Sequence, residues 1–107
     1  MEKEQNLKPE CVFHYFAEIC KIPRPSKKEE KIIAYLKEFG KAHQLETLVD
    51  KAGNVLIRKP ATPGYEDRKT VILQSHIDMV CEKNKDTEHD FEKDPIETYV
   101  DGEWLRA

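Results

Sequence analysis

The residues best suited to chemistry in this chain are His76 and Asp78, which follow the uninterrupted apolar run Val71-Ile72-Leu73. On a strand, residues two apart project to the same side, so this imidazole and carboxylate can act together where the strand ends. A neutral imidazole is a common zinc ligand, and a neighbouring carboxylate can accept the second ring N–H and fix the tautomer. The spacing therefore predicts that His76 binds metal and that Asp78 has a supporting role in catalysis.

Two other interpretations of these residues stay open. His76 and Asp78 can serve only as polar groups that end a strand, because three-residue motifs are weak evidence of a site. Cys81 follows shortly after His76 and could pair with it as a nucleophile, but such a pair needs a third orienting group and the sequence marks none. A catalytic zinc normally has three protein ligands. These residues alone therefore do not complete a catalytic centre.

A second group of possible metal ligands is the acidic stretch over 82–97, where carboxylates recur at short intervals and are broken by lysines. The glycine that a calcium-binding loop needs for its turn is missing, so a calcium site is not expected. His89 lies in this stretch and is expected to be a solvated loop residue. Only Phe91 could anchor the polar segment over 82–95, and loops of that length are uncommon unless they are functional or flexible.

Composition narrows the class of protein. A chain of 107 residues suffices for one small domain, and 38% hydrophobic with 36% charged residues is typical of a soluble, folded, charge-rich protein. The net charge is -3 and the two signs are interspersed, so neither nucleic acid nor a membrane surface is expected as a partner. No apolar run is long enough to span a bilayer.

The cysteines and the N-terminus predict a cytoplasmic location. Cys11, Cys20 and Cys81 form an odd set without a Cys-x-x-Cys pair, which fits a reducing compartment and disfavours a thiolate zinc site. Cys11 and Cys20 fall on the apolar stripe of a predicted helix and are expected in the core. Residues 1–6 are polar and lack the apolar core of a signal peptide.

Apolar periodicity predicts two helices. The first is expected over 9–20 and ends before the two prolines of Ile22-Pro23-Arg24-Pro25, since proline disfavours a helical conformation in the residue before it. Ser26 and Glu29 have the spacing of a capping box, in which each side chain accepts a free N–H of the first turn. A second helix is therefore expected from there to about Ala42.

Strands are predicted in three places. Apolar residues over 45–49 and 54–58 flank a polar turn and predict a hairpin, and Asp101-Gly102 predicts a second one. The run over 70–76 is continuous rather than alternating, which favours a central strand covered on both faces, as in layered α/β folds. The predicted helices and strands would cover only part of such a sheet, so the chain is expected to be the front of a larger domain.

Five short segments occur together in an order and spacing that are specific as a set. They are Ile22-Pro23-Arg24-Pro25-Ser26, Gly53-Asn54-Val55-Leu56-Ile57-Arg58-Lys59-Pro60-Ala61, Leu73-Gln74-Ser75-His76-Ile77-Asp78-Met79-Val80, His89-Asp90-Phe91 with Asp94-Pro95-Ile96, and Asp101-Gly102-Glu103-Trp104-Leu105. From about Pro9 to Ala107, this set resembles the N-terminal part of the aminoacyl-histidine dipeptidases (Xaa-His dipeptidases, or peptidase D), a family of the co-catalytic di-zinc peptidase superfamily.

The resemblance implies an α/β fold in which residues 1–107 are the N-terminal portion of a mixed-sheet, three-layer zinc-peptidase catalytic domain. It implies that His76 is a metal ligand and that Asp78 is the acidic residue that supports the site. Two Zn²⁺ ions, replaceable by Co²⁺ or Mn²⁺, would bind with the help of later residues, among them a bridging Asp and a Glu general base. The activity implied is hydrolysis of short Xaa-His peptides by a homodimer that assembles through a separate domain.

Because those later residues are not in this sequence, the 107-residue piece is expected to hydrolyse nothing and to bind zinc weakly at best. The rival interpretation is a non-catalytic α/β interaction or regulatory module, and a truncation product without a separate role is a third. Sequence beyond Ala107 with an Asp-containing glycine-rich loop and a Glu-Glu pair would favour the enzyme. A stable monomer that ends at Ala107 would favour the module.

Overall fold

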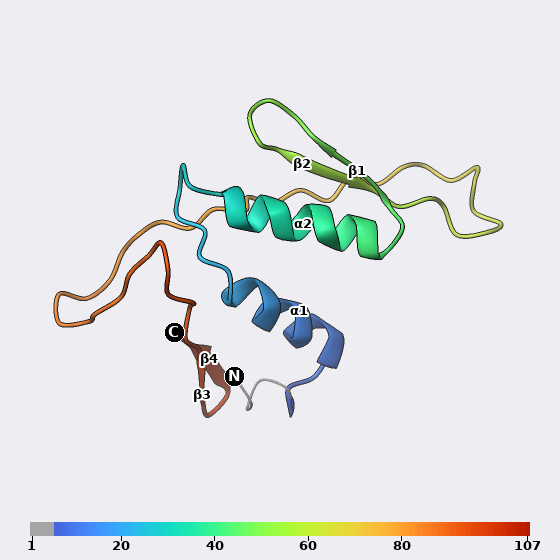
Figure 1. The fold of residues 1–107 in the computed structure, drawn as a ribbon. Helices are drawn as coiled ribbons and strands as arrows, with labels where there is room; N and C mark the ends of the chain where they lie inside the picture. The colour runs from blue at the N-terminus through green and yellow to red at the C-terminus, as the bar shows by residue number, and fades with distance from the viewer. Residues whose placement is uncertain (1–5) are drawn as a thin grey trace. The chain divides into compact units, whose positions relative to one another are not determined.

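The computed structural model describes residues 6–107 (Figure 1). The polar N-terminal segment, from which no signal peptide was predicted, therefore lies outside the described residues except for Asn6. The chain divides into two compact units: the first comprises the described residues up to Ile32 together with Asp78–Ala107, and the second comprises Ile33–Ile77. The chain thus leaves the first unit after Ile32 and returns to it two residues after the predicted metal ligand His76.

Helix α1 spans Glu10–Cys20 in the first unit, as the apolar spacing predicted. Pro9 precedes it in an extended conformation as the N-cap, a place where a missing N–H is tolerated because the first-turn donors have no helical partner. Cys20 is buried, with 2% of its surface exposed. Cys11 is exposed, so the prediction of a core position is wrong for it; neighbouring Val12 is 56% exposed too, which shows that no described segment covers this turn.

Helix α2 spans Glu30–Ala42 and ends in a Schellman motif, close to the predicted end. The Leu45 N–H donates to the Gly40 carbonyl at 2.8 Å, and the Gln44 N–H donates to the Lys41 carbonyl at 3.0 Å. Gln44 adopts a left-handed conformation with φ of 56°, at the position that glycine usually takes in this motif. The motif turns the chain directly into the first strand.

Strands β1 (Glu46–Val49) and β2 (Val55–Arg58) pair in antiparallel fashion in the second unit, which confirms the first predicted hairpin. Asp50 closes the turn between them: its Oδ1 accepts the Asn54 N–H at 2.9 Å, and its Oδ2 accepts the Asn54 side-chain amide at 2.8 Å. These donors favour the charged carboxylate and lower the pKa of Asp50, the side-chain bond most of all. Gly53 supplies the positive φ, 90°, that the turn requires.

Two glycines let helix and hairpin approach closely within the second unit. A Cβ on Gly40 would lie 1.8 Å from Thr47 Oγ1, so the backbone of α2 is in contact with β1 at this point. A Cβ on Gly53 would lie 3.2 Å from Ile33 Cδ1, so the hairpin turn also lies against the start of α2 in this unit.

The segment over 70–76 does not form the predicted central strand. It is irregular, and Val71, Ile72 and Leu73 expose 78%, 85% and 92% of their surfaces. A strand is stabilised by a neighbour that pairs with its backbone N–H and C=O groups. Within residues 6–107 no strand lies paired beside this segment. The run is apolar, as a buried strand requires, but no neighbouring strand that could pair with it lies among the described residues.

Strands β3 (Tyr99–Asp101) and β4 (Trp104–Arg106) form the second predicted hairpin, in the first unit. The residues at the ends of the two strands, Asp101 and Trp104, pair with each other, so the turn has two residues, Gly102 and Glu103. Gly102 has φ of 60°, whereas Glu103 has no positive φ. This pattern is typical of the type II′ turn, which begins with glycine.

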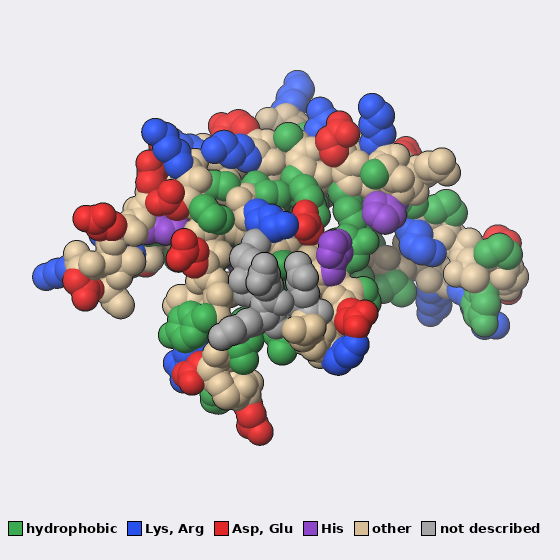
Figure 2. Space-filling model, turned by 60° about the horizontal axis from the view of Figure 1, so that its bottom comes forward, with side chains coloured by type: hydrophobic (Ala, Val, Ile, Leu, Met, Phe, Trp, Pro, Cys, Tyr) green, Lys and Arg blue, Asp and Glu red, His purple; other side chains and the backbone are tan. Residues whose placement is uncertain are grey.

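The described residues thus combine two helices with two hairpins, in agreement with the α/β prediction. Among these residues Cys20 and Ile32 are buried, with 2% and 1% of their surfaces exposed, and Pro25 is buried between the helices in sequence, so the core is small. Basic and acidic side chains are interspersed on the face in Figure 2, and neither sign forms a continuous patch there. Neither helix of this part of the chain has the length and apolar character that a membrane crossing requires.

Candidate functional site

Asp78 is held by the segment that links the two helices. The Ser26 hydroxyl donates a hydrogen bond to Asp78 Oδ2 at 2.5 Å. The adjoining backbone reinforces the contact, because the Met79 N–H donates to the Arg24 carbonyl at 2.9 Å and the Ser26 N–H donates to the Met79 carbonyl at 3.1 Å. Pro25 and Met79 form an isolated parallel bridge. Two segments that are 52 residues apart in sequence are therefore paired beside the predicted acid.

This arrangement corrects the capping-box prediction for Ser26. Helix α2 begins only at Glu30, and the Glu29 carboxylate accepts the Lys27 backbone N–H at 2.6 Å. Lys27 has φ of 71°, which breaks the helical path between Ser26 and the helix. The Ser26 hydroxyl consequently binds Asp78 instead of a first-turn N–H.

His76 lies in the irregular segment of the second unit, and its side chain is exposed. Asp78 is half-buried, and it belongs to the first unit. Asp78 thus accepts a hydrogen bond within its own unit. The prediction that His76 follows a formed strand is wrong for the described residues. The roles of His76 as metal ligand and Asp78 as supporting acid stay predictions.

A cavity of about 540 Å³ in the first unit is lined in part by Ser26. Cys81, His89 and Phe91 also line it. The His89 ring is half-buried and meets the Phe91 ring edge-on with centroids 4.9 Å apart, so it is more covered than a solvated loop residue is expected to be. Cys81 is an exposed free thiol.

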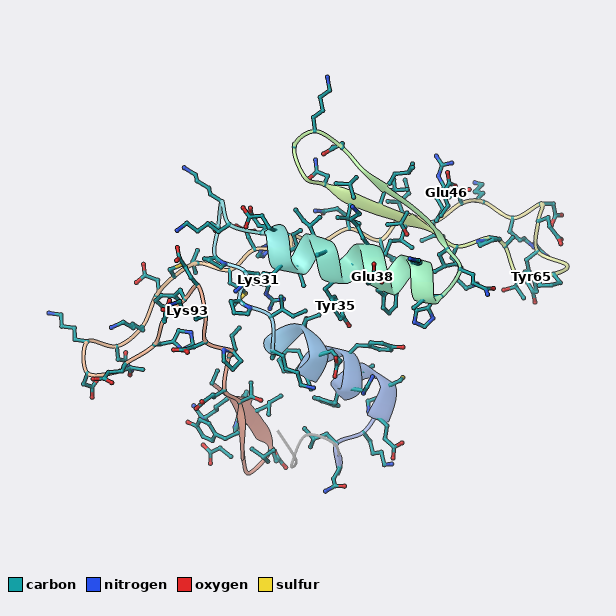
Figure 3. All side chains as sticks on the ribbon, viewed as in Figure 1. Lys31, Tyr35, Glu38, Glu46, Tyr65 and Lys93 are labelled. Atoms are coloured by element: carbon teal, nitrogen blue, oxygen red, sulfur yellow. The ribbon has the colours of Figure 1, made fainter. Side chains whose placement is uncertain are left out.

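The acidic stretch is anchored more firmly than its sequence indicated. The Asp90 N–H donates to Asp94 Oδ2 at 2.7 Å, and the Asp94 N–H donates to the Asp90 carbonyl at 2.8 Å, which closes a turn. Lys31 Nζ donates to the Glu92 carbonyl at 2.9 Å and fastens this turn to the start of α2. Figure 3 labels Lys31 and, on the turn, Lys93. The Asp94 carboxylate is therefore engaged in local structure.

The described residues do not complete a metal site. Within 6–107, no group of three or more His, Cys, Asp or Glu side chains gathers in a way that could hold an ion. His76 and Asp78 are side chains of the kinds that zinc sites use, but they amount to one imidazole and one carboxylate. These two side chains are therefore compatible with only part of a zinc site, and a zinc ion would need further protein ligands.

Two known proteins are similar to this chain over nearly its whole length. Cytosol non-specific dipeptidase of Escherichia coli (strain K12) is 50% identical over 107 residues, which is 100% of this chain and 22% of that protein. The crystal structure of aminoacylhistidine dipeptidase from Vibrio alginolyticus matches with a TM-score of 0.91 and 48% identity, over 95% of this chain and 21% of that one. No protein-family model matches the chain.

The resemblance to the aminoacyl-histidine dipeptidases is confirmed. Both relatives are dipeptidases by name and hence hydrolases, and the structural match confirms the α/β fold class. The chain spans about a fifth of the length of each relative. The sequence predicts a role for Asp78 but not its hydrogen bond with Ser26, because no local pattern links residues 52 positions apart. The only available signal was that Ser26 ends one of the segments that carry the resemblance.

Proposed function

We propose that this chain is the N-terminal part of the catalytic domain of a zinc-dependent dipeptidase that hydrolyses Xaa-His dipeptides. The observation that carries the proposal is the 50% identity, over the whole chain, to a dipeptidase of which the chain spans 22%. The apolar run Val71-Ile72-Leu73 supports it, because side chains that are 78–92% exposed are typical of a surface that another part of a protein covers.

In this proposal His76 binds one metal ion through a ring nitrogen. Asp78 accepts the other ring N–H, which keeps the imidazole neutral and fixes its direction. Two Zn²⁺ ions, or Co²⁺ or Mn²⁺ in their place, would polarise the scissile carbonyl and lower the pKa of a bound water when present. The bridging Asp, the general base and the remaining ligands would come from outside residues 1–107.

The partners follow from the same proposal. The substrate is a short peptide, and the longer protein forms a homodimer through a domain separate from this chain. A cytoplasmic location fits the odd number of cysteines, which include no Cys-x-x-Cys motif, and the word cytosol in the name of the E. coli relative. The isolated chain is expected to hydrolyse nothing and to bind zinc weakly at best, because residues 6–107 gather no set of three donors.

The first test is to read the gene beyond the codon for Ala107 and to express the whole protein. Hydrolysis of an Xaa-His dipeptide should disappear on chelation and return with Zn²⁺. It should fall by more than about 100-fold in His76→Ala, because loss of a ligand should cost more than the roughly 10- to 100-fold that loss of a group supporting a ligand costs. His43→Ala, which removes an exposed imidazole at the end of α2, is the matched control and should leave activity unchanged.

The alternative, a non-catalytic interaction or regulatory module, makes the opposite prediction. A reading frame that stops at Ala107 and yields a stable, inactive monomer would support it. Isothermal titration of the isolated chain adds an independent check, because tight stoichiometric zinc binding would contradict the view that these residues hold only part of a site.

A further inference from the structure

We propose that Ser26 is a positioning residue for Asp78 in the dipeptidase reaction, an inference that rests on the proposed function. The Ser26 hydroxyl donates a hydrogen bond to Asp78 Oδ2 at 2.5 Å, so the hydroxyl and the carboxylate are in direct contact. A carboxylate held in this way has a fixed orientation. Ser26 therefore limits the orientations that the Asp78 carboxylate can take within the first unit.

The backbone around Ser26 makes the contact a built feature of the first unit. Two main-chain hydrogen bonds join Met79 to Arg24 and to Ser26, at 2.9 Å and 3.1 Å. Pro25, which is buried, fixes its own φ and so limits the directions that the next residue can take. The hydroxyl also lies 3.4 Å from the Met79 carbonyl, a longer and weaker contact than the one to Asp78.

Ser26 thereby joins the segment between the two helices to Asp78, the proposed supporting acid. Because the Lys27 backbone turns away from the helix with φ of 71°, the hydroxyl is not used as a cap. The role of Ser26 in α2 is consequently small, and its loss should affect the orientation of Asp78 more than the fold. A variant without the hydroxyl should therefore remain folded and show its effect in kcat.

The test uses the full-length protein that contains this chain, with an Xaa-His dipeptide as substrate. Ser26→Ala is expected to lower kcat about 5- to 10-fold with KM changed less than about twofold, because the bond orients a charged group and does not touch substrate. Ser26→Thr keeps the hydroxyl and should recover at least about half of the wild-type kcat. Thr62→Ala removes a hydroxyl from an exposed loop of the second unit and should leave kcat unchanged.

A double-mutant cycle with Asp78 separates positioning from a structural role. If Ser26 acts through Asp78, Ser26→Ala adds no further loss of kcat in the Asp78→Ala background. The same proportional loss in both backgrounds would show a structural role and overturn the inference. Should Ser26→Ala fold poorly, Ser26→Cys keeps the shape with a weak donor and should lie between alanine and serine in kcat.

The two proposals fail in different ways. A wild-type protein that hydrolyses no dipeptide overturns the proposed function and the role of Ser26 with it. An active wild type, in which His76→Ala is inactive but Ser26→Ala retains the wild-type kcat, overturns the role of Ser26 alone.

Discussion

Truncation of Leu73 to alanine tests most directly whether this chain is part of a larger domain. Leu73 exposes 92% of its surface, so it keeps less than about a tenth of the roughly 2 kcal/mol that a fully buried leucine side chain contributes. Leu73→Ala should therefore change the unfolding free energy of the isolated chain by only about 0.2 kcal/mol. In a longer protein that covers this side chain, the lost transfer free energy and the cavity should cost about 2–5 kcal/mol.

Urea unfolding followed by circular dichroism measures the difference in both proteins. With a slope of roughly 3 kcal/mol/M, the upper end of the range for small proteins, the expected loss lowers the midpoint of the full-length protein by about 0.7–1.7 M. Lys69→Ala, in the exposed loop just before the apolar run, is the control and should change the unfolding free energy by less than about 0.5 kcal/mol. A loss below about 0.5 kcal/mol for Leu73→Ala in the full-length protein would refute the partial-domain reasoning.

Three further predictions concern the second unit. Gly40→Ala should destabilise the protein by about 1–3 kcal/mol, because the new Cβ would lie 1.8 Å from Thr47 Oγ1. Adding Thr47→Ala should remove part of that loss in urea unfolding, since the Thr47 Cβ at 3.0 Å remains close. Gln44→Gly should raise the melting temperature by relieving about 1 kcal/mol of left-handed strain at φ of 56°, and a lower melting temperature would contradict this view. The pKa of Asp50 is lowered, chiefly by the hydrogen bond from the Asn54 side chain. The contribution of Asp50 to the free energy of unfolding is therefore full above its unfolded-state pKa of about 3.9, and it is lost as the pH falls through the lower folded-state pKa. Asp50→Asn should therefore flatten the melting temperature against pH below about pH 5, and an unchanged slope would show that the turn does not depend on this charge.

Local patterns predicted the elements whose hydrogen bonds are themselves local. The apolar spacing before Pro23 predicted α1, and the polar turns at Asp50 and Gly102 predicted both hairpins. In each case the bonded groups are at most about a dozen residues apart, so side-chain preferences within a short window decide the outcome. His76 and Asp78 also fall within one short window, which is why their spacing alone marks them as the candidate site.

The predictions that were wrong each depended on a distant partner. Ser26 and Glu29 have the spacing of a helix cap, yet the Ser26 hydroxyl donates its hydrogen bond to the distant Asp78 carboxylate. The run over 70–76 has the composition of a buried strand, but strand pairing requires neighbours that the described residues do not provide. Cys11 lies on an apolar stripe that no described segment covers at that turn.

The sequence by itself determined the two helices, the two hairpins and the resemblance to dipeptidases, and it predicts His76 and Asp78 as the residues that carry chemistry. Only the tertiary structure decided that Asp78 receives the Ser26 hydroxyl and that Lys31 fastens the acidic turn. The physical reason is that such contacts depend on which distant segments meet. That choice is made by the packing of the whole chain, and no short stretch of residues contains the information.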